Sequence, residues 1–260
     1  MKIKEHIEKI NSSKRKVLSI FLTAGFPDKN NFVDLALNVL ENGADMLELG
    51  IPFSDPLADG PVIQSSSQHA LDNGINLKDV FSFSERIKAK SNKPIVLMGY
   101  ANPIIKYGIK QFCDDALNSG AQGLIVPDVP LEEYDSFYAD KFKEFEKILL
   151  TTPTSPDERI KEIDNKSSGF VYCVSVTGIT GARDNFKEDT LKNIERTYSI
   201  VEKNKMLIGF GISKPEHIKM FAPHCDGVIV ASALIKRLND GKSTKEVCAF
   251  VNELSNACEI

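Results

Sequence analysis

The sequence predicts a (β/α)₈ barrel, a closed ring of parallel strands in which each strand is followed by a helix. Short apolar runs alternate about eight times with helical segments, and composition does not change along the chain. The runs are continuously apolar, which is typical of parallel strands covered on both faces. The length of 260 residues suits such a barrel, which commonly takes about 250 residues. We therefore expect residues 1–260 to form one barrel domain.

The expected strands are short apolar runs bounded by turn residues. The first run ends before Gly25 and Pro27, the second breaks at Gly50, and the third follows Pro94. We expect strands at residues 17–22, 46–49, 95–98, 123–126, 148–151, 170–176, 206–210 and 227–230. Residues 99–103 are expected to be a loop, and Lys147 is expected to precede the fifth strand.

The expected helices carry apolar residues three or four positions apart. Ile3, Ile7 and Ile10 form such a face before the first strand, which predicts an extra N-terminal helix. Gly43 and Gly120 end two of the later segments. We expect helices, some of them short extra ones, at residues 3–10, 31–40, 61–71, 77–89, 109–117, 132–142, 157–163, 185–202, 216–221, 233–238 and 245–258.

A doubly wound open sheet is the alternative fold. It would normally bring a glycine-rich dinucleotide fingerprint after its first strand, and the sequence has none there. The barrel therefore remains the prediction.

Composition argues against several classes of protein. The net charge of −4 and pI near 5.7 give no basic footprint for nucleic acid or an anionic membrane. No run reaches the roughly 18 apolar residues of a membrane helix, and the first ten residues do not resemble a signal peptide. The five cysteines and four histidines show no ligand spacing, so we expect neither a disulfide framework nor a metal site. We expect a cytoplasmic protein.

The most informative stretch, residues 46–61, reads MLELGIPFSDPLADGP. Glu48 is an ionisable group inside an apolar strand, and Asp55 and Asp59 follow in the loop. Burying a carboxylate is costly unless it is paired or held neutral, so such a cluster could divide acid and base work. Alternatively, the two aspartates cap turns and Glu48 makes one structural hydrogen bond. We favour function for Glu48, because a strand-end carboxyl facing a pocket is hard to explain otherwise.

The loops after the last two strands predict a phosphate site. Gly209 and Gly211 follow the seventh strand, and Ser232 opens a helix after the eighth. Small residues let backbone N–H groups approach an anion, and barrels commonly bind phosphate there. The alternative is that the glycines only form a tight turn.

The sixth loop, residues 175–184, carries two glycines among polar residues. This composition fits either a lid over the site or a surface loop, and Gly181 could add a phosphate contact. No expected strand ends in lysine, which disfavours Schiff-base chemistry. The remaining possibility is acid–base chemistry on a phosphorylated substrate.

The motifs LELGIPFSDPLADGP, MGYANP, VPDVP, SVTGITGAR and GFGIS together resemble the tryptophan synthase alpha subunit, in the right order from about Phe21 to Ser232. The resemblance implies a barrel that cleaves indole-3-glycerol phosphate into indole and glyceraldehyde 3-phosphate. By position in the motifs, Glu48 and Asp59 correspond to the catalytic pair. The implied substrate-binding residues are Phe21, Tyr100, Tyr172, Thr180, Gly181, Gly211 and Ser232. Two departures are Ala231, where many members have glycine, and Val176-Thr177, where some carry a basic residue.

The resemblance also implies a partner. The family assembles with a beta subunit as an alpha2beta2 heterotetramer, and pyridoxal phosphate belongs to that beta subunit, so we expect no cofactor in this chain. Asp55, Asn102 and Pro130 lie in the loops that correspond to the interface.

Two other functions deserve comparison. A phosphosugar isomerase or another indole-pathway barrel would share the phosphate loops but often uses a strand-end lysine. A regulatory subunit that only activates its partner would not need Glu48 and Asp59, and both are present.

Overall fold

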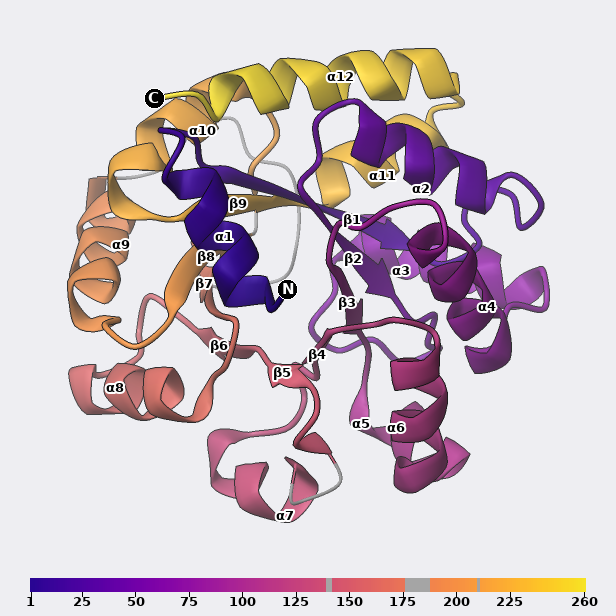
Figure 1. The fold of residues 1–260 in the computed structure, drawn as a ribbon, viewed down its shortest axis with the longest axis horizontal. Coiled ribbons are helices and arrows are strands. Elements are labelled where there is room, and N and C mark those ends of the chain that lie inside the picture. Colours follow the sequence, from indigo (N-terminus) through magenta and orange to yellow (C-terminus); the bar gives the residue numbers. More distant parts are fainter. Residues whose placement is uncertain (139–141, 176–187, 210) are drawn as a thin grey trace.

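The strands form one parallel sheet that curves into a ring (Figure 1). The computed structural model describes residues 1–138, 142–175, 188–209 and 211–260. The order of neighbouring strands is β5-β4-β3-β2-β1-β9-β8-β7-β6. Their bounds are β1 Val17–Thr23, β2 Met46–Gly50, β3 Ile95–Met98, β4 Gly123–Ile125, β5 Glu146–Lys147, β6 Leu149–Thr151, β7 Phe170–Val174, β8 Lys205–Gly209 and β9 Gly227–Val230. The predicted barrel architecture is confirmed.

The fifth expected strand is divided into β5 and β6, and this division closes the ring. Its first half pairs with β4 and its second half pairs with β7. Only Ile148 separates the halves, and its N–H still donates to the Leu124 carbonyl oxygen. One continuous stretch therefore serves as neighbour to both strands.

Helices surround the strands in the ring of Figure 1. The first of them are α1 Ile3–Asn11, α2 Phe32–Glu41, α3 Pro61–Asp72, α4 Leu77–Lys88, α5 Ala101–Tyr107, α6 Ile109–Asn118, the 3₁₀ turn η1 Leu131–Glu133 and α7 Tyr134–Tyr138. They are followed by α8 Asp157–Lys166, α9 Glu188–Ile200, α10 Pro215–Phe221, η3 Ala222–His224, α11 Ser232–Asn239 and α12 Thr244–Ala257.

Two local expectations were wrong. Residues 101–103 begin helix α5 and are not a loop; Pro103 lies in its first turn, where a missing N–H costs nothing. Lys147 lies within strand β5 and ends it. It is nevertheless far from the carboxyl end of the fifth stretch at Thr151, so it gives no strand-end lysine at the site.

Helix α1 covers the amino ends of the strands and lies across the ring in Figure 1. The Ile3 N–H donates to the Glu146 carboxylate at the start of β5. The amide of Asn11 donates to the Asp226 carbonyl oxygen just before β9, and the His6 ring bonds the Asp45 carbonyl oxygen just before β2. This end of the barrel is therefore closed, and the carboxyl ends are left for a site.

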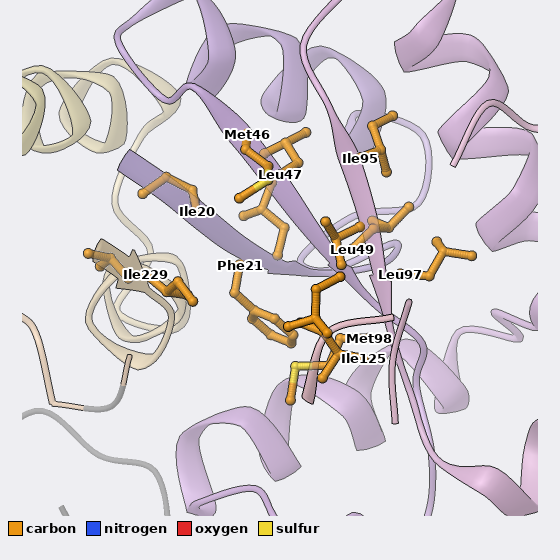
Figure 2. Packing of buried hydrophobic residues seen from close by; sticks show 14 of the residues in the cluster. Ile20, Phe21, Met46, Leu47, Leu49, Ile95, Leu97, Met98, Ile125 and Ile229 are labelled. Carbon is orange, nitrogen blue, oxygen red and sulfur yellow. The ribbon is translucent and has the colours of Figure 1, made fainter. Parts of the chain in front are cut away.

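The barrel interior is an apolar core to which most strands contribute. Every residue of β1, β2, β3 and β9 is buried. Figure 2 shows Phe21 of β1 and Met98 of β3 extending toward the same region, beside Ile125 of β4. These are residues at or near the carboxyl ends of their strands, so the core leads directly into the site.

Candidate active site

The site begins where β2 turns into the loop that leads to α3. Glu48 lies in the strand and is 1% exposed, and Asp59 lies in the loop and is 7% exposed. Pro61 then starts α3 at a position where proline suits a helix. The predicted catalytic pair is therefore held between a strand of the core and a helix start.

Glu48 is held on one side of its carboxyl group. Ser19 Oγ of β1 donates a hydrogen bond to Glu48 Oε1 at 3.0 Å. Glu48 Oε2 is buried and has no hydrogen-bond partner among the described residues. Burial raises the pKa of Glu48 to about 8, although the Ser19 hydrogen bond lowers it. Glu48 is therefore protonated at neutral pH.

Asp59 is held by a phenol. Tyr100 Oη donates to Asp59 Oδ2 at 2.8 Å and accepts from the Ala58 N–H at 3.2 Å. Burial raises the pKa of Asp59 to about 6, and the Tyr100 hydrogen bond opposes that rise. Asp59 is therefore ionised at neutral pH, while Glu48 retains its proton.

The two carboxyl groups face one small cavity. It is lined by Phe21, Glu48, Asp59, Ile63, Met98, Tyr172 and Ala231. Its volume is about 10 Å³, which is about the space of one water molecule. Four of these residues were predicted for the site, and the structure brings them together from β1, β2, the following loop and β7.

Two glycines make room for the aromatic rings around this cavity. A Cβ atom on Gly50 would lie 2.4 Å from Phe21 Cζ, and one on Gly209 would lie 2.1 Å from Tyr172 Oη. Any larger residue at either position would displace the ring. The glycines that end β2 and β8 therefore determine where Phe21 and Tyr172 lie.

The predicted phosphate residues lie at the ends of adjacent strands. Strands β8 and β9 are paired; Gly211 follows β8, and Ser232 begins α11 directly after β9. Gly211 has φ of +84°, a left-handed conformation that favours glycine. Ala231, beside Ser232, lines the cavity of the carboxyls. Thr180 and Gly181, the other predicted residues of this end, and the predicted lid lie outside the described residues.

The predicted interface residues are on the surface. Asp55, Asn102 and Pro130 are all exposed. Asp55 and Asn102 line a second hollow of about 610 Å³ between the β2–α3 loop and α5. In the same loop, Leu57 is 83% exposed. The surface beside the loop that carries Asp59 is thus hollowed and partly apolar.

Sequence reasoning missed five contributors to this site. Three of them line the cavity, namely Ile63, Met98 and Ala231. The other two are Ser19, which holds Glu48, and the Tyr100 hydroxyl, which holds Asp59. Tyr100 had been expected only as a substrate-binding residue. The single polar residue in the apolar run 17–22 was the available signal for Ser19, since alternate residues of a strand share a face.

The described part of the chain brings no three His, Cys, Asp or Glu side chains to where they could hold a metal ion. Nor does any described helix have the length and apolarity needed to cross a membrane.

The arrangement can combine acid and base chemistry on one molecule. A pair of carboxyl groups whose surroundings separate their pKa values supplies one proton donor and one anion at the same pH. Here the donor is Glu48 of β2 and the anion is Asp59, eleven residues later in the loop that follows that strand. The strand ends of β8 and β9 beside them suit an anionic group of the substrate.

Known proteins share this sequence and fold over nearly their whole length. Residues 7–259 match the family model described as tryptophan synthase alpha chain. The tryptophan synthase alpha chain of Thermoanaerobacter pseudethanolicus is 44% identical, over 97% of this chain and 98% of its own. A solved protein from Aquifex aeolicus VF5 has a TM-score of 0.92 and 35% identity, covering all of both chains. A structure of Mycobacterium tuberculosis tryptophan synthase has a TM-score of 0.90 and 30% identity, covering 99% of this chain and 98% of that one.

Proposed function

The chain belongs to the tryptophan synthase alpha chain family, and we propose how its site carries out the reaction of that family. The alpha subunit is a lyase of tryptophan biosynthesis. It cleaves indole-3-glycerol phosphate into indole and glyceraldehyde 3-phosphate, and indole passes to the beta subunit. The observation that carries the proposal is that Glu48 and Asp59 face one cavity with their pKa values separated by burial.

The first step is protonation of the indole ring. Glu48, which is protonated at neutral pH, gives its proton to C3 of the ring and so makes the ring an electron sink. Asp59, which is ionised, accepts a hydrogen bond from the ring N–H and stabilises the positive charge that develops there. Each such contribution by a positioned side chain is typically worth about 10²–10⁴-fold in rate.

The second step breaks the carbon–carbon bond. Glu48, now a carboxylate, takes the proton of the glycerol hydroxyl next to the ring. The bond between the ring and that carbon breaks, its electron pair returns to the ring, and the aldehyde of glyceraldehyde 3-phosphate forms. Glu48 ends the cycle protonated, as it began, so one carboxyl group can serve as both acid and base.

Substrate binding uses two parts of the site. The backbone N–H groups near Gly211 and Ser232 bind the phosphate at the ends of β8 and β9. Phe21, Met98 and Ile63 contact the indole ring. Because the cavity has room for about one water molecule, binding must move some of these apolar side chains.

The partner is a beta subunit in an alpha2beta2 heterotetramer in the cytoplasm. The family implies the complex, and the exposed positions of Asp55, Asn102 and Pro130 are consistent with an interface there. Pyridoxal phosphate belongs to the beta subunit, and the steps above need no cofactor in this chain.

An indole-release assay with indole-3-glycerol phosphate tests the proposal. The chain has no tryptophan, so indole fluorescence is read against tyrosine alone. We expect kcat/KM to fall below pH 6, where Asp59 becomes protonated, and above pH 8, where Glu48 loses its proton. Substrate phosphate also titrates near pH 6, so the alkaline limb is the diagnostic one. Activity that keeps rising through pH 9 would contradict the role of Glu48 as the acid.

A further inference from the structure

We propose that Ser19 is a positioning residue for Glu48: it holds Oε1 and thereby makes Oε2 the oxygen that exchanges protons with the substrate. The proposal rests on the function proposed above for Glu48. Ser19 does not line the cavity and is fully buried, so it would act through Glu48 and not by touching the substrate.

The pairing of β1 and β2 places Ser19 directly beneath the site. Phe21 pairs with Glu48, and Ser19 pairs with Met46, two residues earlier on both strands. Alternate residues of a strand share a face, so Ser19 and Phe21 both face the side on which Glu48 lies. Phe21 and Glu48 line the cavity, which leaves Ser19 one layer deeper in the barrel.

A serine is an unusual residue in that layer of the barrel interior. Barrel interiors are dominated by branched apolar residues, and a buried hydroxyl is costly without a hydrogen bond. The Ser19 hydroxyl makes its bond to Glu48 Oε1 at 3.0 Å. A hydroxyl has one proton to donate and lone pairs to accept, so it can bond Glu48 both as a carboxylate and as a protonated acid. Those are the two states through which Glu48 passes in each cycle.

The two oxygens of Glu48 are thereby made unequal. Oε1 has its partner in Ser19, whereas the buried Oε2 has none among the described residues. The other titratable groups facing this region are Asp59 from the loop and Tyr172 from β7, whose pKa is raised by burial and by both carboxylates. Loss of the Ser19 hydroxyl would free the carboxyl group to rotate and would disfavour its charged form.

The test compares two replacements of the same shape. Ser19→Thr keeps a hydroxyl, and Ser19→Val replaces it with a methyl group. Both are β-branched and suit a strand, so any crowding is common to the two. Purified full-length chains are assayed for indole release from indole-3-glycerol phosphate between pH 6 and 10, and circular dichroism checks that each is folded.

We expect Ser19→Val to lower kcat by about 10-fold or more, the size of a lost hydrogen bond to a charged group. The alkaline limb of its kcat–pH profile should move to higher pH by about one pH unit, and KM should change little. Ser19→Thr should restore both kcat and the position of the limb. Equal kcat and equal limbs for Thr and Val would overturn the proposal, because Ser19 would then only fill space.

Two further variants keep the result interpretable. Ser19→Ala removes the hydroxyl without crowding and should repeat the effect of Val if both branched variants misfold; a wild-type pH profile in Ser19→Ala would overturn the proposal. Glu48→Gln distinguishes a failure of the proposal for Ser19 from a failure of the role proposed for Glu48. In that background Ser19→Val should have no further effect on residual turnover, whereas full activity of Glu48→Gln alone would reject the role of Glu48 itself.

Discussion

Buried carboxyl groups at the two ends of this barrel differ in the number of hydrogen bonds that they accept. At the amino end, Asp164 of α8 is 3% exposed and accepts from the N–H groups of Glu202, Lys203 and Asn204 and from the Asn204 amide. At the carboxyl end, Glu48 is equally buried and accepts one hydrogen bond from Ser19 among the described residues. The two carboxyls have similar burial but very different numbers of donors.

Two other buried acids, Asp45 and Asp59, follow the same division. Asp45 at the amino end pairs with Arg15 and accepts from the Leu18 N–H. Asp59 at the carboxyl end is held by Tyr100 and has a raised pKa. A carboxylate that accepts several hydrogen bonds fixes the chain in place, whereas burial with a single donor raises the pKa, far enough in Glu48 that it keeps its proton at neutral pH. Asp164 and Asp45 at the amino end therefore accept from more donors than Glu48 and Asp59, the proposed catalytic pair, at the carboxyl end.

The largest expected effect is on turnover at the carboxyl end. Glu48→Gln keeps the volume of the side chain but removes the ionisable group, so kcat should fall by about 10³-fold or more. Asp59→Asn should also be severe, and Asp59→Glu less so. The measurement is indole release at pH 7 with circular dichroism as the check on folding. A folded Glu48→Gln protein with near-normal kcat would show that the carboxyl group of Glu48 is not needed for turnover.

The next effect is on stability at the amino end. Asp164→Ala leaves three backbone N–H groups of residues 202–204 without their acceptor, and should lower the free energy of unfolding by about 3 kcal/mol. Asp114→Ala is the control, because the exposed Lys110–Asp114 pair is screened by solvent and should contribute almost nothing to stability. Urea unfolding measures both. The kcat of folded Asp164→Ala should stay normal. A large loss of kcat would mean that Asp164 at the amino end also affects the site at the carboxyl end.

A smaller effect is expected at the phosphate end. Ser232→Asp places a negative charge at the start of α11, beside the proposed phosphate, and should raise KM by about 100-fold through like-charge repulsion. The matched control is Ser232→Asn, because asparagine has the size of aspartate without its charge. Steady-state kinetics at fixed ionic strength compare them. Equal KM values for Asp and Asn would place the phosphate elsewhere.

Most of the order of strands and helices could be predicted from the sequence. The alternation of apolar runs and amphipathic segments predicted the order of strands and helices, because each run is buried on both faces. It missed the division of the fifth strand and helix α5. The division depends on two different neighbours, and Pro103 was interpreted as a loop residue although it suits a first helical turn.

The site was predicted where residues lie close in sequence and missed where contacts are long-range. Glu48 and Asp59 share one motif, whereas the Tyr100–Asp59 bond joins residues 41 apart and the Ser19–Glu48 bond joins residues 29 apart. No local pattern encodes such pairs. The roles given to the site residues, and a single domain over residues 1–260, stay predictions.

The last expected effect joins the two halves of the comparison, because it measures what a buried carboxyl group with one donor costs in stability. The pKa of Glu48 is about 8 in the folded protein, against an ordinary value of 4.5. Below pH 4.5 both folded and unfolded chains hold the proton and no cost arises. As pH rises from 4.5 to 8 the unfolded chain releases the proton first, so the free energy of unfolding falls, and above pH 8 it levels off.

Glu48→Gln has no proton to release and lacks this cost. Its melting temperature relative to wild type should therefore rise between pH 5 and pH 8 by about 10 °C, at roughly 2–4 °C for each kcal/mol in a chain of this size. Exposed Glu132 is the control of opposite sign: Arg159 lowers its pKa to about 2, so Glu132→Gln should show a difference from wild type that is nearly constant over this range. Calorimetry at pH 5, 6, 7 and 8 gives both series. A difference for Glu48→Gln that does not change with pH would mean that Glu48 is already ionised in the folded protein. It could then not be the acid that protonates the ring, whatever its place in the cavity.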